Sequence, residues 1–221
     1  METETLAASL QVGCCHTQRK TKMNKRVPFV LLFLALLLSG VELFAQTRIR
    51  DVYAAAPDSI FPLLTKNNRL DQIDFRENNM QAVVKNRFDG HSELLILNDR
   101  YLRMRLSERC VVEMRLLTDS TFCMVQTYNG PVADSRVRLF DIQWNELPCA
   151  IERPSVDEFL DEDIDMDVRL ALQALPLIKA SLSEENDFIT WQLQTGELTK
   201  EQRQKAEGKV REINRLLSQP E

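Results

Sequence analysis

The chain has 221 residues, with 28 Lys and Arg against 33 Asp and Glu, and a formal net charge of −5. Hydrophobic residues make up 44% and charged residues 28%, which are ordinary values for one folded domain or two small ones. The acidic balance gives no overall basic surface, so we expect no nucleic-acid partner. No segment matches a catalytic signature, so the sequence indicates destination and fold more clearly than activity.

Residues 23–45 have the layout of a secretory signal peptide. The basic start Met23 to Arg26 is followed by an apolar run, Val27 to Leu38, and by Ala45-Gln46. As a helix this run would span about 18 Å, at roughly 1.5 Å per residue, which is less than the roughly 30 Å hydrocarbon core of a membrane. We therefore predict cleavage between Ala45 and Gln46, no stable membrane span afterwards, and a location in the periplasm or cell envelope.

Residues 1–22 do not belong to such a leader. Their Cys-Cys-His run at 14–16 is contiguous and lacks the spacing of zinc sites, so we interpret them as a misannotated upstream extension and Met23 as the true start. An oxidising compartment would allow at most one disulfide and leave one free thiol in the mature chain. The three remaining cysteines are Cys110, Cys123 and Cys149.

Residues 46–147 predict an N-terminal α+β part that begins with helices. From Arg48 to Leu64 the apolar residues follow helical spacing, with Pro57 as a break. Asn68 has the residue type of an N-cap, so a second short helix is predicted to begin there. From Met80 onwards the apolar period changes to two, which indicates strands.

An antiparallel meander of about six strands is predicted beyond Met80. Asp89-Gly90 lies between two apolar runs and predicts a hairpin with a type I′ turn. The run Leu94 to Leu97 is apolar on both faces, so we expect it to be a central strand. Turn residues at 119–120 and 129–131 separate the later strands.

The two middle strands have a register that alternation and charge both support. The expected cross-strand pairs are Met104 with Val112, Leu102 with Met114, and Arg103 with Glu113. The last pair is expected on a face open to solvent, because only one face of the meander should be buried. An anion-binding patch of arginines on that face is an alternative to ordinary cross-strand pairing, which we favour. Its members would be Arg103, Arg105, Arg115, Arg136 and Arg138.

Residues 148–155 are predicted to be a linker, and residues 156–221 a smaller helix–hairpin–helix part. The apolar residues from Val156 to Leu175 form one helical stripe. In the hairpin, Ile178, Ala180 and Leu182 should face Ile189, Trp191 and Leu193. A capping box at 199–202 opens a last helix that should extend to Leu217. The predicted fold class is α+β, an antiparallel β-meander of about six strands with helices packed on one face, followed by this smaller C-terminal part.

Short motifs in a fixed order carry a family resemblance over residues 50–145. They are Pro57-Asp58-Ser59-Ile60, Leu63-Leu64-Thr65, Asn68-Arg69-Leu70-Asp71, Ile73-Asp74-Phe75, Asn86 to Ser92, Leu106-Ser107, Gly130-Pro131 and Asp134-Ser135-Arg136. This region resembles an uncharacterised family of exported Bacteroidales proteins, the domain of unknown function 3256. The resemblance implies export but supplies no activity, cofactor or site residue. Members of that family continue past the last helix into another strand, so the ending at Glu221 leaves the completeness of the C-terminal sheet open.

Two sites are considered as alternatives to plain surface. Asp161, Asp163 and Asp165 have the spacing of calcium ligands, but Met166 stands where an EF-hand needs Gly, so we expect an ordinary helix start and no metal site. Ser59 lies in an Asp-Ser-aliphatic motif that resembles the O-glycosylation signal of periplasmic systems in that bacterial group.

Catalysis has little support in the sequence. His91 and Ser92 are adjacent in a predicted strand, so they point to opposite faces and cannot form a catalytic pair. We therefore expect no catalytic residue and no cofactor. The sequence favours an exported, non-catalytic binding or scaffolding module with an unknown protein or small-molecule partner. The alternatives are a carrier or sensor of a small apolar ligand such as a lipid and, third, a hydrolase.

Overall fold

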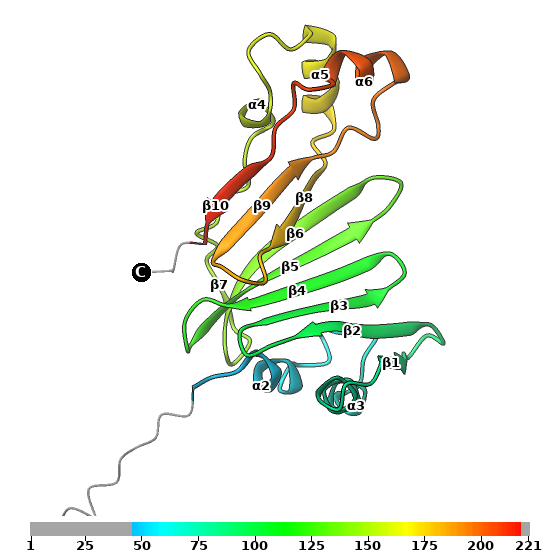
Figure 1. Ribbon diagram of the computed structural model, residues 1–221, viewed down its shortest axis with the longest axis vertical. Coiled ribbons are helices and arrows are strands. Elements are labelled where there is room, and N and C mark those ends of the chain that lie inside the picture. The colour runs from blue at the N-terminus through cyan, green and yellow to red at the C-terminus, as the bar shows by residue number, and fades with distance from the viewer. Residues whose placement is uncertain (1–45, 218–221) are drawn as a thin grey trace, which may run out of the picture. The chain divides into compact units, whose positions relative to one another are not determined.

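A seven-stranded antiparallel sheet, called the main sheet, is the largest element of the computed structural model, which describes residues 46–217 (Figure 1). Its strand order is the chain order, so every strand pairs with the next. The strands are β1 (Ala82–Lys85), β2 (His91–Leu97), β3 (Tyr101–Ser107), β4 (Cys110–Leu116), β5 (Thr121–Asn129), β6 (Ala133–Asp141) and β7 (Glu146–Leu147). The predicted meander is thus confirmed, with a short seventh strand added.

The predicted upstream extension and signal peptide lie outside the described residues. Residues 46–217 belong to one compact unit. Within that part of the chain, no helix is long and apolar enough to cross a membrane.

The predicted register of β3 and β4 is confirmed. Met104 pairs with Val112, and Arg103 pairs with Glu113. The hairpin between β1 and β2 also forms, but its turn is not the predicted type I′. Asp89 has a positive φ of 62°, whereas Gly90 does not, because the loop is longer than a two-residue turn. Asn86 closes this loop by accepting hydrogen bonds from the backbone N–H groups of Phe88 and Gly90.

The strand β2 is not the central strand that its apolar run predicts. It is second from the edge, between β1 and β3, and its pairing with β3 shifts at a bulge between Leu94 and Ile96. Leu94 is buried, but Leu95, Ile96 and Leu97 are only partly covered. A continuous apolar run here therefore reflects a bulged strand near the edge rather than a strand buried on both faces.

Two helices, α2 (Ile49–Ala54) and α3 (Lys66–Glu77), cover one face of the main sheet, called the helix-covered face. The first helix is much shorter than the predicted 48–64 segment, because the chain turns before Pro57. The second begins one residue after its N-cap, Thr65, and Asn68 closes a capping box from inside the helix, so the predicted cap at Asn68 is wrong. Trp144 ties the layers by donating from Nε1 to the carbonyl of Val52 at 3.0 Å.

A second, three-stranded sheet, called the small sheet, has the order β10-β9-β8. Its strands are β8 (Ile178–Leu182), β9 (Phe188–Leu193) and β10 (Ile213–Leu216). The hairpin register is as predicted, with Ala180 opposite Trp191. The predicted last helix is too long, because α6 (Lys200–Ala206) ends early and Gly208 takes a positive φ of 74°. The turn at this glycine lets the chain return as β10.

The predicted helix over 156–175 is in fact two helices, α4 (Val156–Phe159) and α5 (Met166–Ala174). Between them Leu160 is extended and makes an isolated antiparallel bridge with Val210, and a turn at residues 162–163 leads into α5. Most of the apolar stripe is buried as expected, including Val168 and Leu172, but Leu175 at its end is exposed. The segment 148–155 holds no helix or strand, yet Ile151 is buried in that same core.

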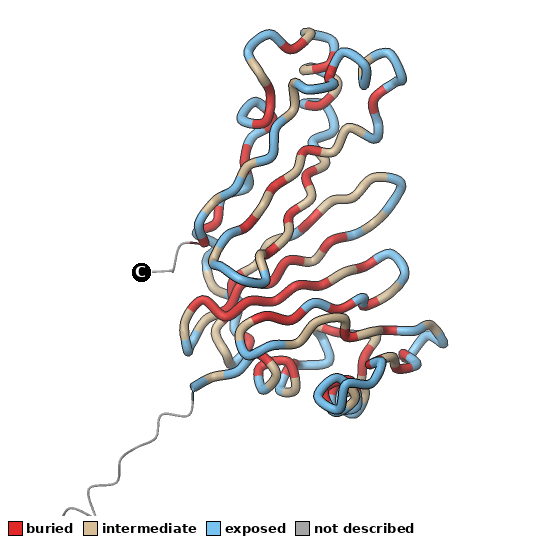
Figure 2. The backbone as a smooth tube through the Cα atoms, in the orientation of Figure 1, coloured by how far each residue is buried: buried red, intermediate tan, exposed pale blue. Residues whose placement is uncertain are grey.

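The small sheet packs on the other face of the main sheet, called the sheet-covered face (Figures 1 and 2). The expectation of a solvent-exposed face is therefore wrong for the strands under the small sheet, although Arg103 and Arg105 on β3 remain about half exposed on this face. Glu113 and Arg115 are each only 5% exposed. The five arginines also do not share a face: Arg138 lies over the Phe140 ring, whose side chain belongs to the helix-covered core, whereas Arg115 belongs to the sheet-covered face. Alternation identified the two faces but could not show that both are covered.

Candidate functional site

Polar side chains are buried between the two sheets because the backbone N–H groups of β8 need acceptors there. As the edge strand of the small sheet, β8 turns every second backbone N–H away from β9. Three main-sheet side chains accept these hydrogen bonds: Asp134 from Ile178 at 3.0 Å, Ser135 from Ala180 at 2.9 Å, and Glu113 from Leu182 at 3.3 Å. The edge is thereby closed by side chains rather than by another strand.

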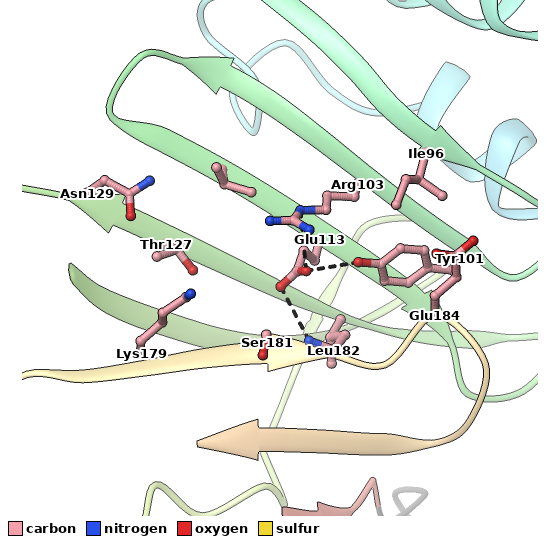
Figure 3. Close-up of a pocket in the computed structure, with 11 residues that line it drawn as sticks. Ile96, Tyr101, Arg103, Glu113, Thr127, Asn129, Lys179, Ser181, Leu182 and Glu184 are labelled. Carbon is pink, nitrogen blue, oxygen red and sulfur yellow. Dashed lines mark hydrogen bonds and ion pairs between the residues drawn. The ribbon is translucent and has the colours of Figure 1, made fainter. Parts of the chain in front are cut away.

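Next to these three hydrogen bonds, the two sheets leave a cleft of about 370 Å³ (Figure 3). It lies between β8 and the sheet-covered face of the strands β2 to β5. Its lining residues are Ile96, Tyr101, Arg103, Val111, Glu113, Thr127, Asn129, Lys179, Ser181, Leu182 and Glu184. Most of the exposed lining is polar or charged, and three side chains carry aliphatic surface into it. The volume lies within the range of small-molecule sites, although the lining is more polar than in most of them.

Glu113 is the buried charge of the cleft. Its Oε1 accepts a hydrogen bond from the Tyr101 hydroxyl at 2.9 Å, and its Oε2 accepts from the backbone N–H of Leu182. Burial raises the pKa of Glu113, while the Tyr101 hydroxyl and the charges of Arg103 and Lys179 oppose that shift. Burial and the adjacent Glu113 carboxylate together raise the pKa of Tyr101, so the phenol remains a hydrogen-bond donor.

Two cations enter the cleft from opposite walls. Arg103 belongs to β3, and its Nε lies 3.8 Å from Glu113 Oε1. Lys179 belongs to β8, and within residues 46–217 it forms no ion pair. Figure 3 shows the Arg103 guanidinium beside Glu113 and the Lys179 ammonium farther along the cleft, near Thr127.

Neutral hydrogen-bonding groups complete the lining. Thr127 is buried, and its hydroxyl lies 2.8 Å from the Ser135 hydroxyl. Ser181 and Asn129 place a hydroxyl and an amide at the cleft. Such groups can orient a polar ligand, whereas they would lose hydrogen bonds to water against an apolar one.

Glu113 is held in place by the protein. Both of its oxygens accept hydrogen bonds from protein donors, and the residue is 5% exposed. In the described part of the chain, no group of three or more His, Cys, Asp or Glu is placed to hold a metal ion.

The three aspartates of the candidate calcium segment are not brought together. Asp163 pairs with Lys209 at 2.8 Å, and Asp165 pairs with Lys205 at 3.2 Å. Asp165 also caps α5 by accepting from the backbone N–H of Asp167. These lysines hold the pKa of both carboxyl groups below its usual range, so the segment is a neutralised helix start.

The remaining predicted positions are spread over the fold. Ser59 is exposed in a turn, next to Asp58, which pairs with Arg69 and Arg87. His91 is exposed, while Ser92 is buried and donates to the Leu106 carbonyl, so the two side chains do lie on opposite faces.

The cysteines do not pair in the described residues. Cys110 lies in the core of the helix-covered face and Cys123 in the core of the sheet-covered face, while Cys149 is exposed. Burial raises the pKa of the Cys123 thiol far above its usual range, so that thiol is a neutral core group.

Sequence reasoning found the Arg103–Glu113 pair but missed the cleft around it. Lys179 and Ser181 are separated from Glu113 by many residues, and only the docking of β8 brings them together. The available signal was the alternation in Ile178 to Leu182, which places Lys179 and Ser181 on one side of a strand.

The fold and the cleft define an α+β protein with two antiparallel sheets that bury polar side chains between them. The model of the family described as "Protein of unknown function (DUF3256)" matches residues 40–215, so the chain belongs to this family. No functionally curated protein matches the chain.

A solved structure with a similar fold is a domain of an uncharacterized protein from Porphyromonas gingivalis W83. It has a TM-score of 0.62 and 24% sequence identity, and the match covers 75% of this chain and 90% of that one. At this identity the likeness concerns the fold alone. Together with the family match, it agrees with the resemblance that the motifs over residues 50–145 indicate.

Proposed function

We propose that this chain is an exported protein of the periplasm or cell envelope that binds a small polar ligand in the cleft between its two sheets. The observation that carries the proposal is the polar lining, in which two cations from different sheets face one space.

An apolar ligand is less well supported by the same geometry. The space between the meander and the helices, where a lipid would have to lie, is filled by side chains. Phe122 packs against Phe140 and Trp144 with ring centroids 5.5 and 4.8 Å apart. Phe61 closes the cluster, with its ring 5.7 Å from Trp144. The cleft itself has too little apolar surface to compensate for desolvating its charges.

The binding proposal is tested by filling the cleft. We would record backbone amide NMR spectra while adding separate monosaccharides, amino acids, hydroxylated organic acids and, as the apolar probe, laurate. We expect at least one polar probe to shift the amides of Ser181 and Leu182, and Ser181→Trp to abolish that shift. Gln204→Trp is the matched control, because Gln204 is exposed on α6, outside the cleft lining. Binding of laurate alone, or of no probe, would refute the proposal.

Export has its own test. N-terminal sequencing of the protein from fractionated cells should find it in the envelope fraction, beginning at Gln46. A mature protein that begins at Met1 or Met23 would overturn this part of the proposal.

A further inference from the structure

We propose that the ligand is a hydroxylated organic acid, such as a uronic acid, whose carboxylate lies between Arg103 and Lys179, and that its binding is coupled to proton uptake by Glu113. This inference rests on the proposed binding function and specifies its ligand. It has three parts, concerning the anion, its hydroxyl groups and the proton.

The carboxylate of the ligand is inferred from the two cations. Arg103 makes only a long contact with Glu113, at 3.8 Å, and its side chain is 45% exposed. Lys179 forms no ion pair within the described residues, although its ammonium is directed into the cleft (Figure 3). A guanidinium presents two parallel N–H donors to a carboxylate, and an ammonium can approach the same group from the other wall. One anion would therefore satisfy both cations.

The hydroxyl groups of the ligand are inferred from the neutral lining. Ser181 and Asn129 offer a hydroxyl and an amide, each able to donate and accept, whereas the buried Thr127 hydroxyl is already bonded to Ser135. The cleft of about 370 Å³ corresponds to about a dozen water molecules at about 30 Å³ each. A monosaccharide-sized acid fits this space, and its hydroxyl groups can replace those waters.

The proton is inferred from the place of Glu113 between the cations. Arg103 faces it from β3, Lys179 from β8, and Tyr101 donates to it. No charged group faces it from β5, whose neighbouring residue Val125 is apolar. Without a ligand, the two cations stabilise the ionised carboxylate.

A ligand carboxylate changes that balance. It draws the charge of Arg103 and Lys179 to itself and adds an anion to a site that already contains Glu184. Glu113 would then be a buried carboxylate next to a second one, and such a pair is stabilised by one proton. When the anion binds, one proton moves from solvent to a Glu113 oxygen. This proton returns to solvent when the anion dissociates.

The inference is tested with D-glucuronate as the probe and D-glucose as its neutral counterpart, each titrated against the protein while the amides of Ser181 and Leu182 are followed by NMR. Glucuronate should bind at least about tenfold more tightly than glucose, the effect of one charge-assisted hydrogen bond. Its affinity should rise at least about threefold from about pH 7.5 to about pH 5.5, because the probe stays ionised there while Glu113 takes up the proton.

Variants separate the three parts. Arg103→Gln and Lys179→Gln should each weaken glucuronate binding about tenfold and leave glucose binding unchanged. Glu113→Gln should bind glucuronate at neutral pH as tightly as the natural protein does at low pH, and the pH dependence should disappear. Arg105→Gln is the matched control, because Arg105 lies on the same face of β3 but pairs with Glu93 outside the cleft.

Failures of the two proposals can be told apart. If glucose and glucuronate shift the Ser181 and Leu182 amides with equal affinity, the anion is wrong but the polar-ligand cleft stands. If glucuronate binds tightly with no pH dependence, or if Glu113→Gln retains the dependence, the coupling to Glu113 is wrong. If neither probe nor any other polar compound binds, both proposals fall.

Discussion

The two faces of the main sheet are made by the same strands, yet the buried charged residues of these strands, Glu113 and Arg115, lie on only one of them. On the helix-covered face, Met104, Val112 and Met114 form an apolar layer with exposures of 0 to 1%. On the sheet-covered face, the alternate residue Glu113 is 5% exposed and has an ionisable carboxyl group. The helices satisfy their own backbone hydrogen bonds, whereas the edge strand β8 needs acceptors from the surface on which it packs. The kind of element that covers a face thus determines how polar that face can be.

The largest expected effect tests the apolar layer. Met104→Asp should destabilise the protein by at least about 3 kcal/mol, because it places an unpaired charge opposite Val112. Urea denaturation measures the change. Arg103→Ala, on the other face of the same strand, should cost only about 0.2–1 kcal/mol. Similar losses for both variants would mean that the two faces do not differ as described.

The next effect tests how the small sheet is attached. Arg115 donates to Asp187 at 2.8 Å and to the carbonyls of Ser183 and Glu184, and it is 5% exposed. Arg115→Ala should cost about 2–4 kcal/mol, because it leaves these acceptors without their donor. Hydrogen exchange should accelerate first in the hairpin 178–193. The control Arg136→Ala removes an exposed arginine and should change little; faster exchange throughout the main sheet instead would contradict the assignment.

A smaller effect concerns the pH dependence of stability. Because burial raises the pKa of Glu113 above its unfolded value of about 4.3, the folded state binds the proton more tightly. Its contribution to stability is therefore present at low pH and is lost as the pH rises through the folded pKa. Glu113→Gln keeps an acceptor for Leu182 and a partner for Tyr101 but cannot titrate.

Urea denaturation from about pH 4 to about pH 7 should show the natural protein losing stability relative to Glu113→Gln as the pH increases. Glu113→Ala should be less stable than Glu113→Gln by about 1–3 kcal/mol at every pH, because it leaves the N–H of Leu182 unpaired. A constant difference between the natural protein and Glu113→Gln would show that Glu113 titrates normally.

The smallest effect is expected at the acidic segment. Because Lys209 and Lys205 already neutralise Asp163 and Asp165, calcium gains little there. Replacing chelator by millimolar calcium should move the melting temperature by no more than about 2 °C. A much larger rise, lost when Asp161, Asp163 and Asp165 are changed to Asn, would make this segment a metal site after all.

The local parts of the fold could be predicted from the sequence. The pairing of Arg103 with Glu113 follows from alternation across a short loop, and the hairpin of Ala180 with Trp191 follows in the same way. Helix lengths were overestimated, since an apolar stripe from Val156 to Leu175 continues through a break that only the bridge of Leu160 to Val210 explains.

The cleft could be predicted only in part, because its walls come from distant segments. Charge on Glu113 and Arg115 is normal for an exposed face, and nothing local indicates that β8 will cover it. Predicting the cleft requires the alignment of Ile178, Ala180 and Leu182 with acceptors that lie on two other strands, β4 and β6. This matching is a property of the folded chain and leaves no periodic signal in either segment.

The charged side chains of the sheet-covered face, Arg103, Glu113 and Arg115, also affect the chain before its small sheet has docked. The main sheet is complete at Leu147, and its strands pair in chain order, so it can assemble before the residues of the small sheet have been synthesised. At that stage, the uncovered face presents Arg103, Glu113 and Arg115 to water among its apolar residues. Like charges on neighbouring chains repel, and ionised side chains resist burial between stacked sheets. We therefore expect these charged side chains to disfavour aggregation of a chain whose small sheet has not yet docked.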